Sequence, residues 1–114
     1  MKKRTNGRKK NQDLIKGIVK KLRDQYAPEK IILFGSYAYG KPRRDSDIDL
    51  LIVKNTSERF IDRWVTVRRI LSDSKLLIGL DTLVVTPDEL SERLAAGDQV
   101  IAEIVEKGKL LYAA

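Results

Sequence analysis

Two short apolar runs, at residues 31–34 and 48–53, place the strongest limit on the fold of this chain. Each run has the length of a buried strand and is too short for a typical helix, so we expect two strands of one sheet. A small-residue pair, Gly35-Ser36, directly follows the first run, and Asp47 and Asp49 stand at the start of the second. Backbone N–H groups at such a turn can bind phosphate, and paired carboxylates can hold a divalent cation.

Hydrophobic periodicity and breaker residues predict the other elements. Pro28 ends the first helix, while Thr86, Pro87 and Glu89 supply a cap, a first-turn proline and a capping-box acid for a later one. We expect helices at residues 11–26, 37–40, 87–97 and 100–107, a further helix capped within residues 55–57 with apolar residues from 60 to 71, and strands at residues 31–34, 47–54, 80–85 and 110–112. This order predicts an α/β (α+β) fold, with a small mixed β-sheet flanked by helices.

The positive charge of the chain is concentrated at its N-terminus. The 114 residues include 23 Lys and Arg and 16 Asp and Glu, which gives a net charge of +7. Residues 1–10 hold six of the positive residues and no acid, so the remainder is close to neutral. We expect residues 1–11 to be a basic, disordered tail and residues 12–114 to form one domain. The tail is either a solubilising arm or a segment that contacts nucleic acid through residues 1–10.

The absence of cysteine and histidine limits the chemistry of any site. Without thiolate or imidazole ligands a metal must be bound by oxygen atoms, and Mg²⁺ or Mn²⁺ suits such ligands best. No apolar run approaches the roughly 20 residues that cross a bilayer. We therefore expect no membrane partner and a cytoplasmic location.

Three aspartates are candidate metal ligands and catalytic groups. Asp47 and Asp49 alternate along a strand, so their side chains point to one side and can hold a cation together. Asp81 lies within an apolar strand, where a charge without a partner is unfavourable. If that strand neighbours residues 47–54, the three carboxylates meet, and Asp81 can receive the proton of an attacking hydroxyl. The alternatives are a simple polar turn at residues 45–47 and an ion pair between Asp81 and a nearby Lys or Arg.

The motifs around these aspartates resemble those of the minimal nucleotidyltransferases, which belong to the DNA polymerase β-like nucleotidyltransferase superfamily. The resemblance rests on residues 34–40, on residues 46–50 with their Asp-x-Asp spacing, and on Asp81, and it extends over about residues 12–114. It implies the nucleotidyltransferase fold, ATP as the substrate, and Mg²⁺ or Mn²⁺ as the cofactor.

The resemblance also implies roles for individual residues. The expected catalytic and metal-binding residues are Asp47, Asp49 and Asp81. The expected nucleotide-binding residues are Gly35, Ser36, Ser46, Arg43 and Arg44. Members of the family often carry arginine where this chain has Tyr39, and the two arginines or Lys41 of the following loop can supply the phosphate contact instead.

Many proteins that resemble this chain are antitoxins paired with HEPN-family ribonuclease toxins, in toxin–antitoxin systems of a type VII-like kind. The resemblance implies transfer of AMP from ATP to a hydroxyl acceptor, a tyrosine of the HEPN toxin partner. Three other functions stay open: a non-catalytic antitoxin that covers its toxin, a nucleic-acid-binding module that acts through the basic tail, and an enzyme that modifies a small molecule. The sequence predicts no particular oligomeric state.

The helix expected over residues 60–71 carries two further groups of conspicuous residues. The apolar ones, expected in the core or against a partner helix, are Phe60, Ile61 and Trp64. The basic ones, expected on a solvated face or opposite an acidic partner surface, are Arg63, Arg68 and Arg69.

Overall fold

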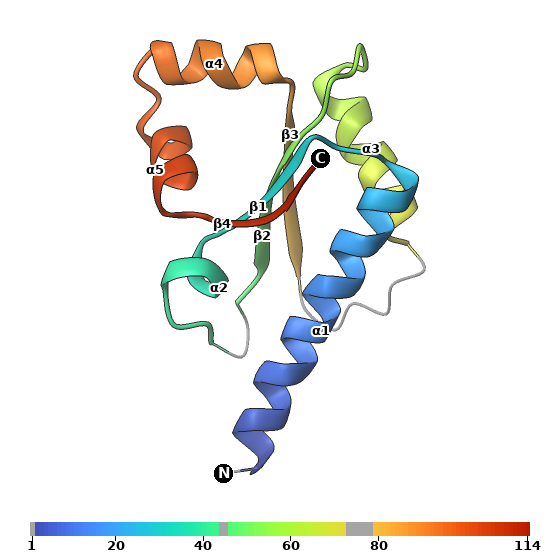
Figure 1. Cartoon of the computed structure of the whole chain (residues 1–114), viewed down its shortest axis with the longest axis vertical. Helices are drawn as coiled ribbons and strands as arrows, with labels where there is room; N and C mark the ends of the chain where they lie inside the picture. The colour runs from blue at the N-terminus through green and yellow to red at the C-terminus, as the bar shows by residue number, and fades with distance from the viewer. Residues whose placement is uncertain (1, 44–45, 73–78) are drawn as a thin grey trace.

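The described part of the chain, residues 2–43, 46–72 and 79–114 of a computed structural model, contains a four-stranded sheet with helices on both faces (Figure 1). In chain order the elements are α1 (Lys2–Gln25), β1 (Lys30–Phe34), α2 (Ser36–Tyr39), β2 (Ile48–Val53), α3 (Phe60–Ile70), β3 (Leu80–Val85), α4 (Pro87–Ala95), α5 (Gln99–Lys107) and β4 (Lys109–Ala113). The expected α/β class is confirmed, and the four expected strands lie within one residue of their predicted bounds.

The sheet is mixed, with the strand order β3-β2-β1-β4. The β1 strand pairs antiparallel with both β2 and β4, whereas β2 and β3 run parallel. Because β2 lies inside the sheet and is covered on both faces, residues 50–53 are buried on both sides. This double burial explains why residues 50–53 of β2 are continuously apolar rather than alternating.

Two hydrophobic clusters hold the helices against the sheet. On one face, side chains of α1 and α3 such as Leu22 and Val67 pack against Leu50 and neighbouring strand residues. On the other face, Ile101 and Ile104 of α5 pack against strand residues that alternate with the first set. Figure 1 shows the same division, with α1 and α3 on one side of the strands and α4 and α5 on the other.

The first helix is longer than the sequence pattern predicted. It begins at Lys2 and continues without interruption to Gln25, through residues 2–11 that we expected to be disordered. Lysine and arginine are good helix formers and make up six of these ten residues, so a helix that is anchored on the sheet can extend into this segment. It ends where Ala27 adopts a left-handed conformation (φ 53°) before Pro28. Within the described ranges, no helix has both the length and the apolar composition needed to cross a membrane.

Of the two predicted helix caps, one is confirmed and one is wrong. The hydroxyl of Thr86 accepts a hydrogen bond from the Glu89 N–H at 3.1 Å, and the Glu89 carboxylate accepts one from the Thr86 N–H at 2.8 Å, as expected for a capping box. By contrast, α3 is capped by Arg59 without a side-chain hydrogen bond. Thr56, one of the three residues among which the cap was predicted, instead accepts from the N–H of Glu58 at 3.1 Å, which forms a local turn before the helix.

Candidate active site

Asp49 and Asp81 lie side by side on neighbouring strands. In the parallel pair of β2 and β3, Asp49 is directly opposite Asp81. Residues opposite each other on paired strands project to the same face of the sheet, here the face covered by α5. The expectation that these two strands are neighbours is confirmed. The alternative of a structural ion pair is not supported, because Asp81 forms no salt bridge within the described residues.

Asp47 reaches the same end of the sheet from the loop before β2. The N–H of Ile48 donates to the carbonyl of Gly79 at 2.9 Å, which fixes this loop beside the residue that precedes β3. A Cβ atom on Gly79 would lie 2.0 Å from Oδ1 of Asp47, so the carboxylate occupies space that any other residue would fill. Gly79 is therefore a positioning residue, and sequence reasoning missed it. A glycine placed two residues before the aspartate of an apolar strand is the signal that could have revealed it.

The turn after β1 brings Gly35 against the carboxylate of Asp49. Phe34 is paired with Asp49 in the antiparallel register, so the next residue lies beside that side chain. A Cβ atom on Gly35 would come within 2.2 Å of Oδ2 of Asp49. The backbone of Gly35 also has φ 72° and ψ −156°, a region that other residues rarely adopt. The turn that starts α2 at Ser36 and the carboxylates thus form one continuous site.

Like charges crowd this site. The pKa of Asp49 is raised from its ordinary value of 3.8 to about 6, first by burial, then by the negative charges of Asp81 and Asp47, and by a hydrogen bond with Asp81. The pKa of Tyr37 is also raised, mainly by burial and secondarily by the charge of Asp47. The burial of Asp49 and the two neighbouring negative charges thus create a local preference for a proton or a cation at Asp49.

The carboxylate oxygens of the site suit a divalent cation, although the three side chains are not already arranged around one metal position. Within residues 2–43, 46–72 and 79–114, no group of three or more acidic side chains already has the geometry of a metal cluster. The available donors are carboxylate oxygens, which Mg²⁺ and Mn²⁺ prefer. Burial and the negative charges of Asp81 and Asp47 raise the pKa of Asp49, and a bound cation would offset both effects. Asp47, Asp49 and Asp81 therefore fit the chemistry of a divalent cation.

Replacing Gly79 with alanine is expected to weaken the binding of Mn²⁺ by about 10–100-fold, the usual effect of losing a group that positions a metal ligand. The physical reason is that the new methyl group would displace the Asp47 carboxylate. Calorimetric titration with Mn²⁺ measures the affinity. Gly17→Ala is the matched control, because a Cβ atom at Gly17 has open space around it. Equal affinities of the Gly79→Ala variant and the unmodified protein would contradict the positioning role.

The loop between α2 and β2 contains the other expected nucleotide-binding residues. The hydroxyl of Ser46 accepts a hydrogen bond from the N–H of Arg43 at 2.7 Å, and the N–H of Ser46 donates to the carbonyl of Arg43 at 3.1 Å. Ser46 thus closes the loop, whereas the side chain of Arg43 is exposed to solvent. Arg44 lies outside the described residues. Binding of nucleotide by Gly35, Ser36, Ser46 and the loop arginines stays a prediction.

A family model described as the nucleotidyltransferase domain matches residues 15–112. The chain therefore belongs to the nucleotidyltransferase domain family. It is 38% identical over 85 residues to a protein of Methanocaldococcus jannaschii that is described as a candidate protein adenylyltransferase, in an alignment covering 72% of this chain and 56% of that protein. It is 31% identical over 96 residues to the protein adenylyltransferase MntA of Shewanella oneidensis, covering 83% of this chain and 62% of MntA. The chain thus spans less than two thirds of the length of either relative.

Solved structures agree with this assignment. A nucleotidyltransferase structure from Sulfolobus solfataricus superposes with a TM-score of 0.67 at 21% identity, covering 96% of this chain and 86% of that one, and shows the shared fold. A chain of a toxin–antitoxin complex solved with AMP-PNP superposes with a TM-score of 0.54 at 28% identity. That alignment covers 85% of this chain and 71% of the other.

Proposed function

We propose that this chain is a magnesium-dependent nucleotidyltransferase that transfers AMP from ATP to a hydroxyl group of a partner protein. The observation that carries the proposal is the convergence of Asp49, Asp81 and the Gly35 turn at one end of the sheet. A carboxylate set beside a phosphate-binding turn is the arrangement that phosphoryl transfer requires. AMP-PNP, an ATP analogue, is present in a toxin–antitoxin complex to which the chain is similar, and this supports ATP as the donor.

Each part of the site has a proposed role in the transfer. The backbone at Gly35 and Ser36 binds oxygens of the triphosphate, because N–H groups at the start of a helix attract anions. The acceptor oxygen attacks the α-phosphorus, the bond from that phosphorus to the bridging oxygen breaks, and pyrophosphate leaves. Asp81 receives the proton of the acceptor hydroxyl. Asp47 and Asp49 would hold Mg²⁺, which when bound would supply charge neutralisation for the triphosphate and the leaving pyrophosphate.

The proposed acceptor is a tyrosine of a HEPN-family toxin. Both curated relatives are described as protein adenylyltransferases, and one similar solved structure is a toxin–antitoxin complex. The carboxylates lie at an end of the sheet where Asp47 and Asp81 are exposed to solvent, so a side chain presented by another protein can approach them. The chain would then act as an antitoxin that silences its toxin by modification.

The proposal predicts that the toxin gains the mass of one or more AMP groups when it is incubated with this protein, ATP and Mg²⁺. A double variant, Asp47→Asn with Asp49→Asn, is expected to remain folded and to transfer no AMP. Intact-mass spectrometry of the toxin and circular dichroism of the variant measure the two outcomes. Unchanged labelling by the double variant would contradict the proposed roles of these carboxylates.

A binding-only antitoxin is the second candidate, and exposed apolar side chains on α3 favour it. Such a protein would neutralise a toxin by covering it, without chemistry. The same double variant distinguishes the two functions, since a binding-only antitoxin would still protect cells that express the toxin. Loss of protection together with loss of labelling supports the enzyme.

A further inference from the structure

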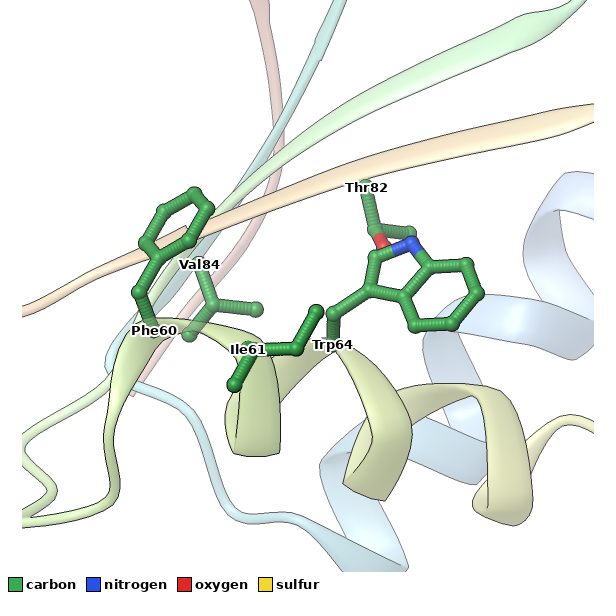
Figure 2. A pocket seen from close by; sticks show the side chains of 5 residues that line it. All are labelled: Phe60, Ile61, Trp64, Thr82 and Val84. Carbon is green, nitrogen blue, oxygen red and sulfur yellow. The ribbon is translucent and has the colours of Figure 1, made fainter.

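An apolar surface outside the active site is formed by the start of α3 and by β3. Phe60, Ile61 and Trp64 of α3 line a pocket of about 240 Å³ together with Thr82 and Val84 of β3, and we call this surface the α3–β3 patch. Figure 2 shows the three α3 side chains beside the two strand residues. The exposed fractions of Phe60, Ile61 and Trp64 are 54%, 59% and 44%. The prediction that these three side chains lie in the core is therefore wrong. The alternative, that they pack against a partner helix, stays a prediction.

The patch lies on the face of the sheet opposite to the carboxylates. Along β3, the side chains of Thr82 and Val84 project toward α3, whereas that of Asp81 projects to the other face. A molecule bound at the patch would therefore leave the Asp49–Asp81 pair accessible. The patch is thus a separate surface, and its existence does not depend on the proposed catalytic role of the chain.

The free edge of β3 next to the patch is already protected against strand addition. Arg63 donates to the carbonyl of Val84 at 3.3 Å, and Arg68 donates to the carbonyl of Leu80. Both carbonyls lie on the edge away from β2, since the carbonyls on the other edge, those of the odd-numbered Gly79 and Val85, accept from Ile48 and Lys54. The two arginines thus occupy two of the acceptors that an added strand would need. Side-chain insertion into the pocket therefore remains as the mode of docking.

The pocket contains one polar group that lacks a partner. The hydroxyl of Thr82 is buried and makes no hydrogen bond within the described part of the chain. A buried hydroxyl without a partner is unfavourable, but this atom is closed to solvent and offers no contact to a docked segment. The volume of about 240 Å³ lies below the roughly 300–1,000 Å³ of small-molecule sites and suits a single inserted side chain.

The charged side chains next to the patch indicate which kind of partner can bind there. The α3 helix with its cap contains four arginines and one aspartate. Arg59 pairs with Asp62, and Arg63 is buried against Glu89. Among the described residues, the arginines of α3 without a carboxylate partner are therefore Arg68, whose guanidinium lies 5.0 Å from the ring centre of Trp64, and the exposed Arg69. A second copy would bring the same two arginines to the contact, which is repulsive. An acidic partner would instead be complementary.

We propose that the α3–β3 patch is a docking surface for an acidic protein segment, which inserts one large apolar side chain into the pocket beside Trp64 and places its carboxylates opposite Arg68 and Arg69. The inserted side chain supplies the apolar contact, and the flanking acids supply orientation and selectivity. Because the patch and the carboxylates are on opposite faces, docking can hold a partner while nucleotide is bound.

Trp64 is the only tryptophan of the chain, so its fluorescence reports on the patch directly. The probe is a tryptophan-free helical peptide of about 18 residues, long enough to form a helix, with Leu and Phe on one face and Glu on the other. A matched peptide carries Lys in place of Glu. We expect the acidic peptide to shift the emission of Trp64 and to bind at least about tenfold more tightly than the basic one.

Two variants test whether binding occurs at the patch. Ile61→Asp is expected to weaken binding of the acidic peptide by at least about tenfold, because it places a charge in the apolar contact. Val100→Asp on α5 is the matched control, since Val100 is 68% exposed and lies on the other face of the sheet. Both positions are exposed, so circular dichroism should show unchanged folds.

Three results would overturn the proposal. The first is absence of binding of the acidic peptide up to about 1 mM, which corresponds to only weak affinity. The second is equal binding of the two peptides, or equal loss of binding in the two variants. The third is a concentration-dependent dimer that Ile61→Asp dissociates, as measured by sedimentation, which would assign the patch to a second copy. None of these outcomes depends on AMP transfer, so they are distinguishable from a failure of the proposed function.

Discussion

Asparagine in place of Asp49 is expected to lower AMP transfer by at least about 10³-fold and, at the same time, to stabilise the metal-free protein at neutral pH. The loss of activity follows from removing a charged ligand at the centre of the site. The gain in stability follows from the crowding of Asp49 by burial and by the charges of Asp81 and Asp47. Asparagine has the same shape but carries no charge, so it avoids both the cost of burying a charge and the repulsion by the two neighbouring carboxylates.

The pH dependence of this gain has a definite sign. The pKa of Asp49 in the folded protein is about 6, above its ordinary value of 3.8. The folded state therefore binds this proton more tightly than the unfolded state does. The stability that Asp49 contributes is fully present below its ordinary pKa and is lost as the pH rises through about 6. The asparagine side chain of the variant does not titrate, so the difference in stability between the variant and the unmodified protein should grow over this range.

Thermal unfolding in the presence of a chelator, at pH 5 and at pH 7.5, measures the difference. The variant should have the higher Tm at pH 7.5, with a smaller advantage at pH 5. Addition of Mg²⁺ should raise the Tm of the unmodified protein more than that of the variant, because the cation compensates the carboxylates. Asp24→Asn is the matched control, since Asp24 is exposed and lies outside the site. A lower Tm for Asp49→Asn at pH 7.5 would show that the carboxylates are not in electrostatic conflict.

The sequence predicted the strands that carry the candidate site residues, but not the contacts between those strands. Asp81 could be identified because a charge in an apolar strand requires a reason, and its strand was placed correctly. The register that sets Asp81 opposite Asp49 depends on pairing between distant segments, which local patterns do not encode. Gly79 was missed for the same reason. Residue 79 must be a glycine only because the folded chain places the carboxylate of Asp47 against it.

The orientation of α3 shows a second limit of periodicity. We expected Phe60, Ile61 and Trp64 in the core or against a partner helix, but the buried face of α3 carries Val67 and Leu71 of the same apolar pattern together with Arg63. Both sets have helical spacing, so the pattern fits two rotations of the same helix. The structure selects the rotation that buries Arg63 because its guanidinium finds acceptors on other elements. Those acceptors cannot be read from the sequence of the helix itself.

Arg63→Ala is expected to destabilise the fold by about 2–4 kcal/mol, because it removes a buried charge that several groups depend on. The side chain of Arg63 is only 8% exposed. It donates to the carbonyl of Glu58 at 2.8 Å, to that of Val84 at 3.3 Å, and to both carboxylate oxygens of Glu89 at 2.6 and 3.2 Å. Alanine would leave these acceptors without their donor and would open a cavity between α3 and the sheet.

The ion pair between Arg63 and Glu89 makes the destabilisation caused by Arg63→Ala depend on pH. The hydrogen bond and charge of Arg63 lower the pKa of Glu89 below its ordinary value. A lowered pKa contributes stability that is present above the ordinary pKa of 4.5 and is lost as the pH falls through the lower value of the folded state. The difference between the unmodified protein and Arg63→Ala should therefore be largest near neutral pH and should shrink in acid.

Urea unfolding at pH 7 and at pH 3 measures both the size and the pH dependence of this loss. Arg59→Ala is the matched control, because Arg59 pairs with Asp62 on the surface and should change stability by less than about 0.5 kcal/mol. Arg63→Lys should recover less than half of the loss, since lysine cannot form the two parallel bonds to Glu89. If Arg63→Ala unfolds at the same urea concentration as Arg59→Ala, the rotation of α3 that buries Arg63 is wrong, and with it the exposure of Phe60, Ile61 and Trp64 that defines the α3–β3 patch.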